Sequence, residues 1–431
     1  MKLEEMILVS VDDHLVEPPD MFDRHIPMAY RDKAPKIVSS EGNDSWVYEG
    51  RRLPNIGLNA VAGRPRKEFG CEPTAYRQMR KGCWDVNARI DDMNANGVLG
   101  SICFPTLPGF AGLLFSGAQD KQAAQVLLSA YNDWHIHDWC GKAPGRFIPL
   151  AILPLWDMGA TVAEVKRVVA KGCHTVTFPD NPAPKGLPSI HDNYWDPLWT
   201  VLSDHDVAIC AHIGTGYAPP HPSMESPIDA WITTMPMSIA NAAADWLFAS
   251  IWQRFPKLRI ALSEGGIGWI PYFLERADFT YEHHRQWTNA NFGKSRPSEV
   301  FNRHFLTCFI DDAFGLRNLD AINSKMVAWE CDYPHSDSVW PKSPEYLWNS
   351  LKHLDDAQID DITHLNAMRL FSYDPFPLLG RANCTVGALR EQARDVDVAE
   401  RPNLGGHNPV NPDGRPVTSG QVVKFFTGAP D

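Results

Sequence analysis

Short apolar runs alternate along the chain with longer segments of helical periodicity. Each run ends at or near a proline, a glycine or an acidic residue, a pattern typical of buried strands. Eight runs are found, at residues 7–12, 98–104, 146–152, 174–178, 207–212, 258–264, 305–310 and 326–332. Segments with a helical period lie between them, at about 120–140, 157–171, 195–203, 236–254 and 270–286. This alternation predicts an α/β fold, the parallel (β/α)8 TIM barrel.

A doubly wound sheet is the competing α/β architecture. It would require a glycine fingerprint, GxGxxG, at the turn after the first strand. The first apolar run is followed instead by Asp13, His14 and two prolines. The barrel is therefore the expected fold.

Two regions do not follow the alternation. Residues 41–79 are rich in glycine, proline and arginine and contain a possible hairpin at about 46–53, so we expect an insertion over the barrel mouth. Residues 376–431 are rich in proline, glycine and asparagine. We expect an extended tail packed on the barrel or on a neighbouring subunit, with disorder as the alternative. The predicted organisation is a barrel over 1–375, followed by this tail.

Composition and charge exclude several classes of protein. The 431 residues are 44% hydrophobic, enough for a large core, and the net charge of -12 without a basic run argues against nucleic-acid binding. No run of about 18 apolar residues is present and the amino terminus is acidic, so we expect no membrane segment and a cytoplasmic location. Nine cysteines without a CxxC pair argue against a disulfide framework or a thiolate zinc site.

Candidate metal ligands lie at the ends of three predicted strands. Asp12 and His14 are two residues apart in the first run, so both side chains can point to the same side of a strand. His212 ends the fifth run and Asp332 the eighth. In a parallel barrel these ends meet at one rim, where barrel enzymes carry their active sites. The nitrogen and oxygen donors predict one divalent ion, with zinc as the first expectation and manganese or iron(II) as alternatives.

Four motifs give the chain a family resemblance. It resembles the amidohydrolase superfamily, in the branch that contains α-amino-β-carboxymuconate semialdehyde decarboxylase and γ-resorcylate decarboxylase. The resemblance spans about residues 7–375 and implies that the metal ligands are Asp12, His14, His212 and Asp332. It also implies a homodimer. The motifs are VDDH at 11–14, AHIG at 211–214, SEGGIGWI at 263–270 and DYPHSD at 332–337.

The chain departs from this resemblance at two positions. The fourth run ends in Phe178, Pro179 and Asp180, without the lysine that binuclear members carbamylate, which favours one metal ion. Glu264 stands where the decarboxylases place a catalytic histidine. A carboxylate there could act as a general base, and burial would raise its pKa. The structural alternative is a carboxylate that caps the following helix.

Further candidates follow the strand ends or lie in the insertion. His335, three residues after Asp332, could orient a metal ligand or contact the substrate, and we place it with Glu264 among the catalytic candidates. Glu17 could bind substrate or pair with an arginine. Aromatic side chains after strand ends could line a pocket for a flat ring or serve only in packing: Phe104, Phe178, Trp269, Tyr333 and Trp340. Arginines of the insertion could bind a substrate carboxylate: Arg51, Arg52, Arg64 and Arg66.

These features together predict a metal-dependent enzyme that acts on a small-molecule substrate. The first expectation is a hydrolase that cleaves a C–N or C–C bond in a small cyclic or aromatic acid through a metal-bound hydroxide, with Glu264 transferring the proton. The alternative is non-oxidative decarboxylation of an aromatic or muconate-type acid. A catalytically dead binding barrel is a third hypothesis, which the four intact ligands disfavour.

Overall fold

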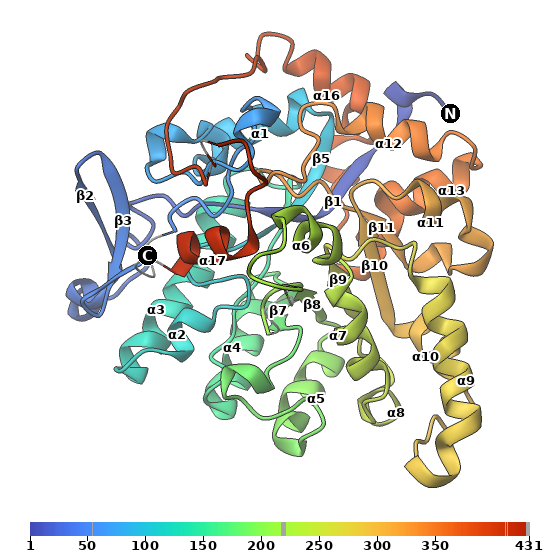
Figure 1. Cartoon of the computed structure of the whole chain (residues 1–431). Coiled ribbons are helices and arrows are strands. Elements are labelled where there is room, and N and C mark those ends of the chain that lie inside the picture. Colours follow the sequence, from blue (N-terminus) through green and yellow to red (C-terminus); the bar gives the residue numbers. More distant parts are fainter. Residues whose placement is uncertain (54, 217–220, 410, 412, 428–431) are drawn as a thin grey trace.

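The computed structural model of the protein describes residues 1–53, 55–216, 221–409, 411 and 413–427. At its centre lie eight strands, surrounded by helices (Figure 1). Each predicted apolar run overlaps one of them, and the predicted TIM barrel is confirmed. The strands are β1 (Leu8–His14), β5 (Val98–Phe104), β6 (Phe147–Ile148), β7 (Thr175–Pro179), β8 (Ala208–His212), β9 (Ile260–Ser263), β10 (Phe305–Phe309) and β11 (Val327–Trp329).

Parallel pairing connects these strands in chain order. One set pairs as β1-β5-β6 and the other as β7-β8-β9-β10-β11. A bridge between Ala151 and Val176 joins the segment after β6 to β7. On the other side, the Asp332 backbone N–H donates to the Asp12 carbonyl at 2.8 Å, and that of His14 donates to the Tyr333 carbonyl at 2.7 Å. These bonds place the carboxyl end of β1 beside the segment that follows β11.

The outer layer is helical. Aspartate side chains cap several of its helices at the amino end; for example, Asp120 accepts from the backbone N–H of Ala123 and Asp157 from that of Ala160. The segment at 236–254, where we expect helical pieces, contains α7 (Ser238–Leu247) and α8 (Ile251–Arg254). The barrel helices are α1 (Val86–Ala95), α2 (Leu113–Ser116), α3 (Lys121–Trp134), α4 (Met158–Val169), α5 (Asp196–Asp204), α6 (Ile228–Thr234), α7 (Ser238–Leu247), α8 (Ile251–Arg254), α9 (Ile270–Thr288), α10 (Pro297–His304), α11 (Ala313–Arg317), α12 (Ser343–Leu351), α13 (Asp356–Asp360) and α14 (Asn366–Leu370).

The segment between β1 and α1 carries a small antiparallel sheet at the side of the barrel (Figure 1). Its strands are β2 (Lys36–Ser40), β3 (Asn43–Tyr48) and β4 (Arg51–Leu53). The chain then runs back toward the barrel, where the N–H groups of Val61 and Ala62 each donate to the Pro334 carbonyl at 3.0 Å. These bonds hold the insertion against the loop after β11.

The carboxy-terminal segment runs back along the barrel to its mouth. It contains α15 (Phe376–Leu379), α16 (Val386–Gln392) and α17 (Ser419–Thr427). The Val386 N–H donates to the Met6 carbonyl at 2.8 Å, and further along bridges form between Glu72 and His407 and between Pro227 and Thr418. The division of the chain into a barrel of 1–375 and a tail stays a prediction.

Two expectations from composition can be compared with the described residues. All nine cysteines are buried and none forms a disulfide. Among the helices of the described residues, none combines the length and the apolar character that a membrane span requires.

Candidate metal centre and active site

The four predicted ligands converge at the carboxyl ends of the strands. The Nε2 atom of His14 lies 3.4 Å from Asp12 Oδ1 and 3.3 Å from both Asp332 Oδ1 and His212 Nε2. The Nε2 atom of His212 lies 3.4 Å from Asp12 Oδ2. All four residues are at most 1% exposed. Residues more than 300 positions apart in the chain thus present nitrogen and oxygen donors to one small space.

The donor atoms fit a divalent cation. Both carboxylate oxygens of Asp12 and of Asp332 are buried and accept no hydrogen bond of suitable geometry from the described residues. Buried carboxylates are almost always paired, and a metal ion is one such partner. The Nδ1 atom of His212 lies 2.7 Å from the Ile213 carbonyl. As a donor to that carbonyl, Nδ1 carries the proton and leaves the Nε2 lone pair facing the cluster.

The electrostatics of the protein groups alone disfavour charge in this cluster. Burial raises the pKa of Asp12 and of Asp332 well above the usual range, and neighbouring carboxylates raise both further. Burial likewise lowers the pKa of His14 well below its usual value and that of His212 to about 3. A divalent cation would reverse the effect on the carboxylates, because its charge stabilises their ionised form.

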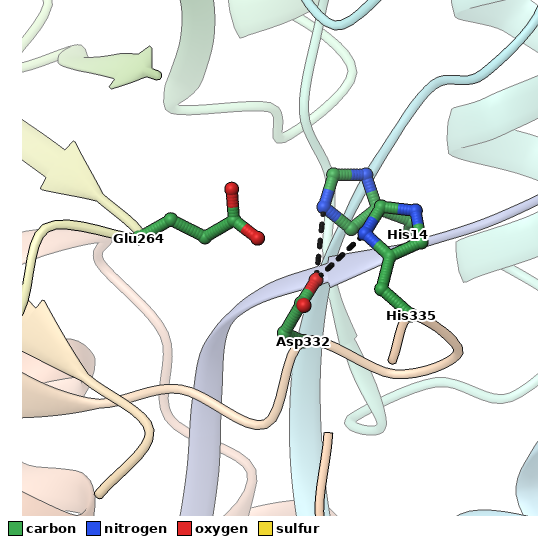
Figure 2. Close-up of side chains that lie close together, drawn as sticks. All are labelled: His14, Glu264, Asp332 and His335. Carbon is green, nitrogen blue, oxygen red and sulfur yellow. Dashed lines mark ion pairs between the residues drawn. The ribbon is translucent and has the colours of Figure 1, made fainter. Parts of the chain in front are cut away.

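Glu264 follows β9 and reaches the same cluster. Its Oε2 atom lies 3.4 Å from His212 Nε2, and its backbone N–H donates to Glu330 Oε2 at 3.1 Å. Figure 2 shows the Glu264 carboxylate pointing toward Asp332 and the two histidines on the opposite side. Burial raises its pKa well above the usual range. Its φ of +59° is unusual for a side chain of this size and orients the residue at the turn after the strand.

His335 packs directly on one of the predicted ligands. Its ring stacks on that of His14 with 3.9 Å between centroids, and its Nδ1 atom lies 2.9 Å from Asp332 Oδ1 (Figure 2). The side chain also lines the cavity above the cluster. His335 is therefore placed to orient two predicted ligands and to contact a bound molecule.

A cavity of about 480 Å³ lies above these residues. Its floor is formed by His212, Glu264, Asp332 and His335. The walls are mainly apolar and come from distant segments: Phe69 and Cys71 of the insertion, Phe110 after β5, Ile228, Trp231 and Ile232 of α6, and Val417 and Val422 of the carboxy-terminal segment. A larger cavity of about 890 Å³ adjoins it and shares Glu264, Phe69 and Ile213.

Comparison with known proteins agrees with this geometry. The amidohydrolase family profile matches residues 23–372, most of the chain. The chain belongs to the amidohydrolase family. It is therefore an enzyme, of hydrolase or decarboxylase type.

Named relatives of this amidohydrolase are decarboxylases. The 2-amino-3-carboxymuconate-6-semialdehyde decarboxylase of Dictyostelium discoideum is 23% identical over 308 residues, 70% of this chain and 80% of the relative. The γ-resorcylate decarboxylase of a Rhizobium species is 23% identical over 320 residues, 69% and 91% of the two chains. A 5-carboxyvanillate decarboxylase mutant from Novosphingobium aromaticivorans, solved with manganese and 3-methoxy-4-hydroxy-5-nitrobenzoic acid, has a TM-score of 0.60 at 16% identity, covering 86% and 99%.

Three predicted substrate-binding residues of the amidohydrolase do not line either cavity. Phe178 packs outward among Trp195, Trp199 and Trp246, with ring centroids 5.0 to 5.6 Å apart, because its position on β7 faces the helices. The Tyr333 hydroxyl donates to Asp92 Oδ2 at 2.6 Å, away from the cluster.

Glu17 is the third of these residues. Its carboxylate accepts from the backbone N–H groups of Thr106 at 3.0 Å and Leu107 at 2.7 Å. It thereby fixes the loop after β5. The structure places Glu17, Phe178 and Tyr333 outside both cavities, so their predicted contact with substrate has no support from this geometry and stays a prediction.

The remaining candidates divide between the two cavities and the surface. Trp269 and Trp340 line the larger cavity, as do Arg64 and Arg66. Arg51 and Arg52 lie exposed on β4 and line neither cavity. Phe104 is fully buried beneath the ligands, with its ring 5.1 Å from that of His212 and 5.9 Å from that of His14.

Two residues at the site of this amidohydrolase were not predicted. Glu330 is buried, lines the larger cavity and has a pKa that burial raises to about 7. Its position two residues before Asp332 could have revealed it, since such residues share a strand face. The ring of Phe110 lies 4.5 Å from that of His14 and 4.4 Å from that of His212. No sequence signal distinguishes it from other loop aromatics.

Proposed function

We propose that this amidohydrolase is a metal-dependent, non-oxidative decarboxylase of an aromatic or muconate-type acid. The observation that carries the proposal is a buried cluster of histidines and carboxylates at the floor of a mainly apolar cavity, with Glu264 beside it. Within the described residues, the Asp12 and Asp332 oxygens accept no hydrogen bond of suitable geometry. The two sequence relatives named above are both decarboxylases, which supports this reaction over hydrolysis.

Asp12, His14, His212 and Asp332 would hold one divalent ion. When bound, the ion supplies positive charge that binds an acidic oxygen of the substrate and orients it. Manganese is our preferred ion over zinc, because the fold relative from Novosphingobium aromaticivorans contains manganese and the donors suit either metal. His335, stacked on His14, would keep that ligand and Asp332 in place.

Glu264 would deliver the proton that decarboxylation consumes. Its protonated carboxyl would donate to the ring carbon that bears the substrate carboxylate. The bond between that carbon and the carboxylate would then break, and carbon dioxide would leave. The electron pair of the broken bond would restore the π system that the protonation had interrupted. The Glu264 carboxylate would regain a proton from water in the adjoining larger cavity, which it also lines.

Hydrolysis is the second candidate, and one residue favours it. Glu264 stands where the family resemblance places a histidine in the decarboxylases, and a carboxylate can act as a general base toward a water molecule. In that reaction Glu264 would have to be ionised before it acts. The two candidates therefore require opposite protonation states of the same side chain.

A carboxyl-labelled substrate tests the proposed reaction. Manganese-loaded protein would be incubated in D2O with dihydroxybenzoates and muconates that carry 13C in the carboxylate. We expect labelled carbon dioxide and a product with one deuterium at the vacated carbon, and neither from chelator-treated protein. Label retained in every compound, together with cleavage of amide or lactone substrates, would contradict decarboxylation and support hydrolysis.

A further inference from the structure

The carboxy-terminal segment crosses the mouth of the barrel and is attached on both sides of it. On one side, His407 and Glu72 of the insertion exchange backbone hydrogen bonds of 2.8 and 2.9 Å. On the other, the Ile228 N–H donates to the Val417 carbonyl at 2.8 Å, at the start of α6. In Figure 1, α17 lies in front of the barrel with α6 next to it, and the two helices are in contact.

This segment contributes side chains to the cavity above the ligand cluster. Asn408, Pro409, Val417 and Val422 line it, together with Phe69 and Phe110. The family match ends at residue 372, so this part of the wall lies outside the region shared with the family. The barrel supplies the floor, and the carboxy-terminal segment supplies a wall of its own.

The charge of the lining limits the kind of molecule that fits. The described lining residues of this cavity include no lysine and no arginine. A substrate anion would therefore be neutralised only at the predicted ligands on the floor. The rest of the molecule would face mainly apolar side chains, together with the carboxyl groups of Glu72 and Asp337. A second carboxylate in this cavity would find no lysine or arginine and would lie near the carboxyl groups of Glu72 and Asp337, which is costly.

We propose that Val417 and Val422 of the carboxy-terminal segment are substrate-binding residues that select aromatic monocarboxylates over aliphatic and dicarboxylic acids. This inference narrows the substrate class of the proposed function, and it rests on that proposal for the reaction that the substrate undergoes. Binding can be measured without turnover, so the two claims can fail separately.

Titration calorimetry on the manganese-loaded protein tests this wall, with benzoate, acetate and cis,cis-muconate as probes. Each good apolar contact in a pocket changes affinity by about tenfold or more. We expect Val417→Asn combined with Val422→Asn to weaken benzoate binding at least about tenfold, with unchanged acetate affinity and metal content. Val398→Asn is the matched control, because Val398 belongs to the same segment, is 39% exposed and lines neither cavity.

Several outcomes would overturn the proposal. In the double variant, these are an unchanged affinity for benzoate or an equal loss of affinity for acetate. An equal loss of benzoate affinity in the Val398→Asn control, or tighter binding of muconate than of benzoate by the unmodified protein, would also contradict it. If the double variant does not fold, Val422→Ala serves instead, with an expected loss of about three- to tenfold. If benzoate binding depends on the two valines but no aromatic acid releases carbon dioxide, the proposed reaction is refuted and the binding role of Val417 and Val422 stands.

Discussion

Asp12 and Asp13 are neighbours on β1 and both are buried, but their carboxylates have different surroundings. Asp13 accepts from the hydroxyl groups of Ser10 and Ser101 and from the Tyr333 backbone N–H at 3.0 Å. Asp12, on the opposite face of the strand, accepts from none of the described residues. The Asp13 carboxylate links β1 to β5 and to the segment after β11. The Asp12 carboxylate points toward the other predicted metal ligands.

A second pair of acidic residues shows the same contrast. Glu17 is buried and accepts two backbone hydrogen bonds. Asp332 is buried too, but its oxygens accept no hydrogen bond of suitable geometry from the described residues, and Oδ1 only lies near the rings of His14 and His335. Burial alone therefore does not distinguish a structural carboxylate from a predicted metal ligand. The distinguishing feature is whether the protein itself supplies partners for the oxygens. Variants at these residues should separate the two classes.

The largest effect is expected at a predicted metal ligand. His212→Ala removes the imidazole that faces Asp12, so we expect loss of both bound metal and activity. The decrease in activity should exceed the roughly 100-fold that removal of an outer partner costs. Elemental analysis and a carbon dioxide assay measure the two quantities. Full metal occupancy in this variant would remove His212 from the ligand set.

The next effect concerns proton transfer by Glu264. Glu264→Gln keeps the size of the side chain but cannot donate a carboxyl proton, so the rate should fall about 10²- to 10⁴-fold with metal retained. The protonated form is active in decarboxylation, so the unmodified enzyme should lose rate as pH rises through the pKa of Glu264, and this limb should disappear in the variant. If the unmodified enzyme instead loses rate as pH falls, and this dependence disappears in the variant, Glu264 acts as a general base and hydrolysis is favoured. A nearly unchanged rate would remove Glu264 from the mechanism.

A smaller effect is expected at His335. Because this ring supports His14 and Asp332 without completing the predicted ligand set, His335→Ala should retain the metal and lose about 10- to 100-fold in activity. Metal content and kcat are measured on the same sample. Metal loss equal to that of His212→Ala would mean that His335 is itself a ligand.

The smallest effect on activity is expected at Glu17. Glu17→Gln should leave kcat/KM within about twofold, because the side chain lines neither cavity and acts on a loop. Its consequence lies in stability. Burial raises the pKa of Glu17 from 4.5 to about 7, so the native state binds more protons than the unfolded state between these values.

The stability of the unmodified protein should therefore fall as pH rises from about 4.5 to about 7, by on the order of 1–3 kcal/mol from this residue. In Glu17→Gln the contribution of this residue to the pH dependence of the unfolding free energy should be absent. Urea unfolding at pH 5 and pH 8 measures it, with metal removed from both proteins. Equal slopes in the two proteins would contradict the assignment.

The sequence was sufficient for the barrel and for the convergence of its strand ends. Apolar runs and helical segments alternate strongly, and parallel strands bring Asp12, His14, His212 and Asp332 to one rim whatever the details of packing. The metal-ligand roles themselves stay predictions.

Side-chain direction and long-range contacts could not be predicted in the same way. Whether Phe178 faces the barrel interior or the helices depends on the register of β7, and a shift of one residue reverses it. The partners of Glu17 lie about 90 residues away in the loop after β5. The apolar walls come from segments hundreds of residues apart, including Phe69 and Val422. Such contacts are set by tertiary packing and leave no local pattern.

Metal analysis of two adjacent variants tests most directly whether unpaired carboxylates mark the metal centre. Asp12→Asn and Asp13→Asn make the same chemical change one residue apart on β1. We predict about one divalent ion per chain in the unmodified protein and in Asp13→Asn, with stability lowered by about 1–3 kcal/mol in the latter. Asp12→Asn should lose the ion while its metal-free form stays folded. Two ions per chain, equal retention in both variants, or metal loss only in Asp13→Asn would contradict this account.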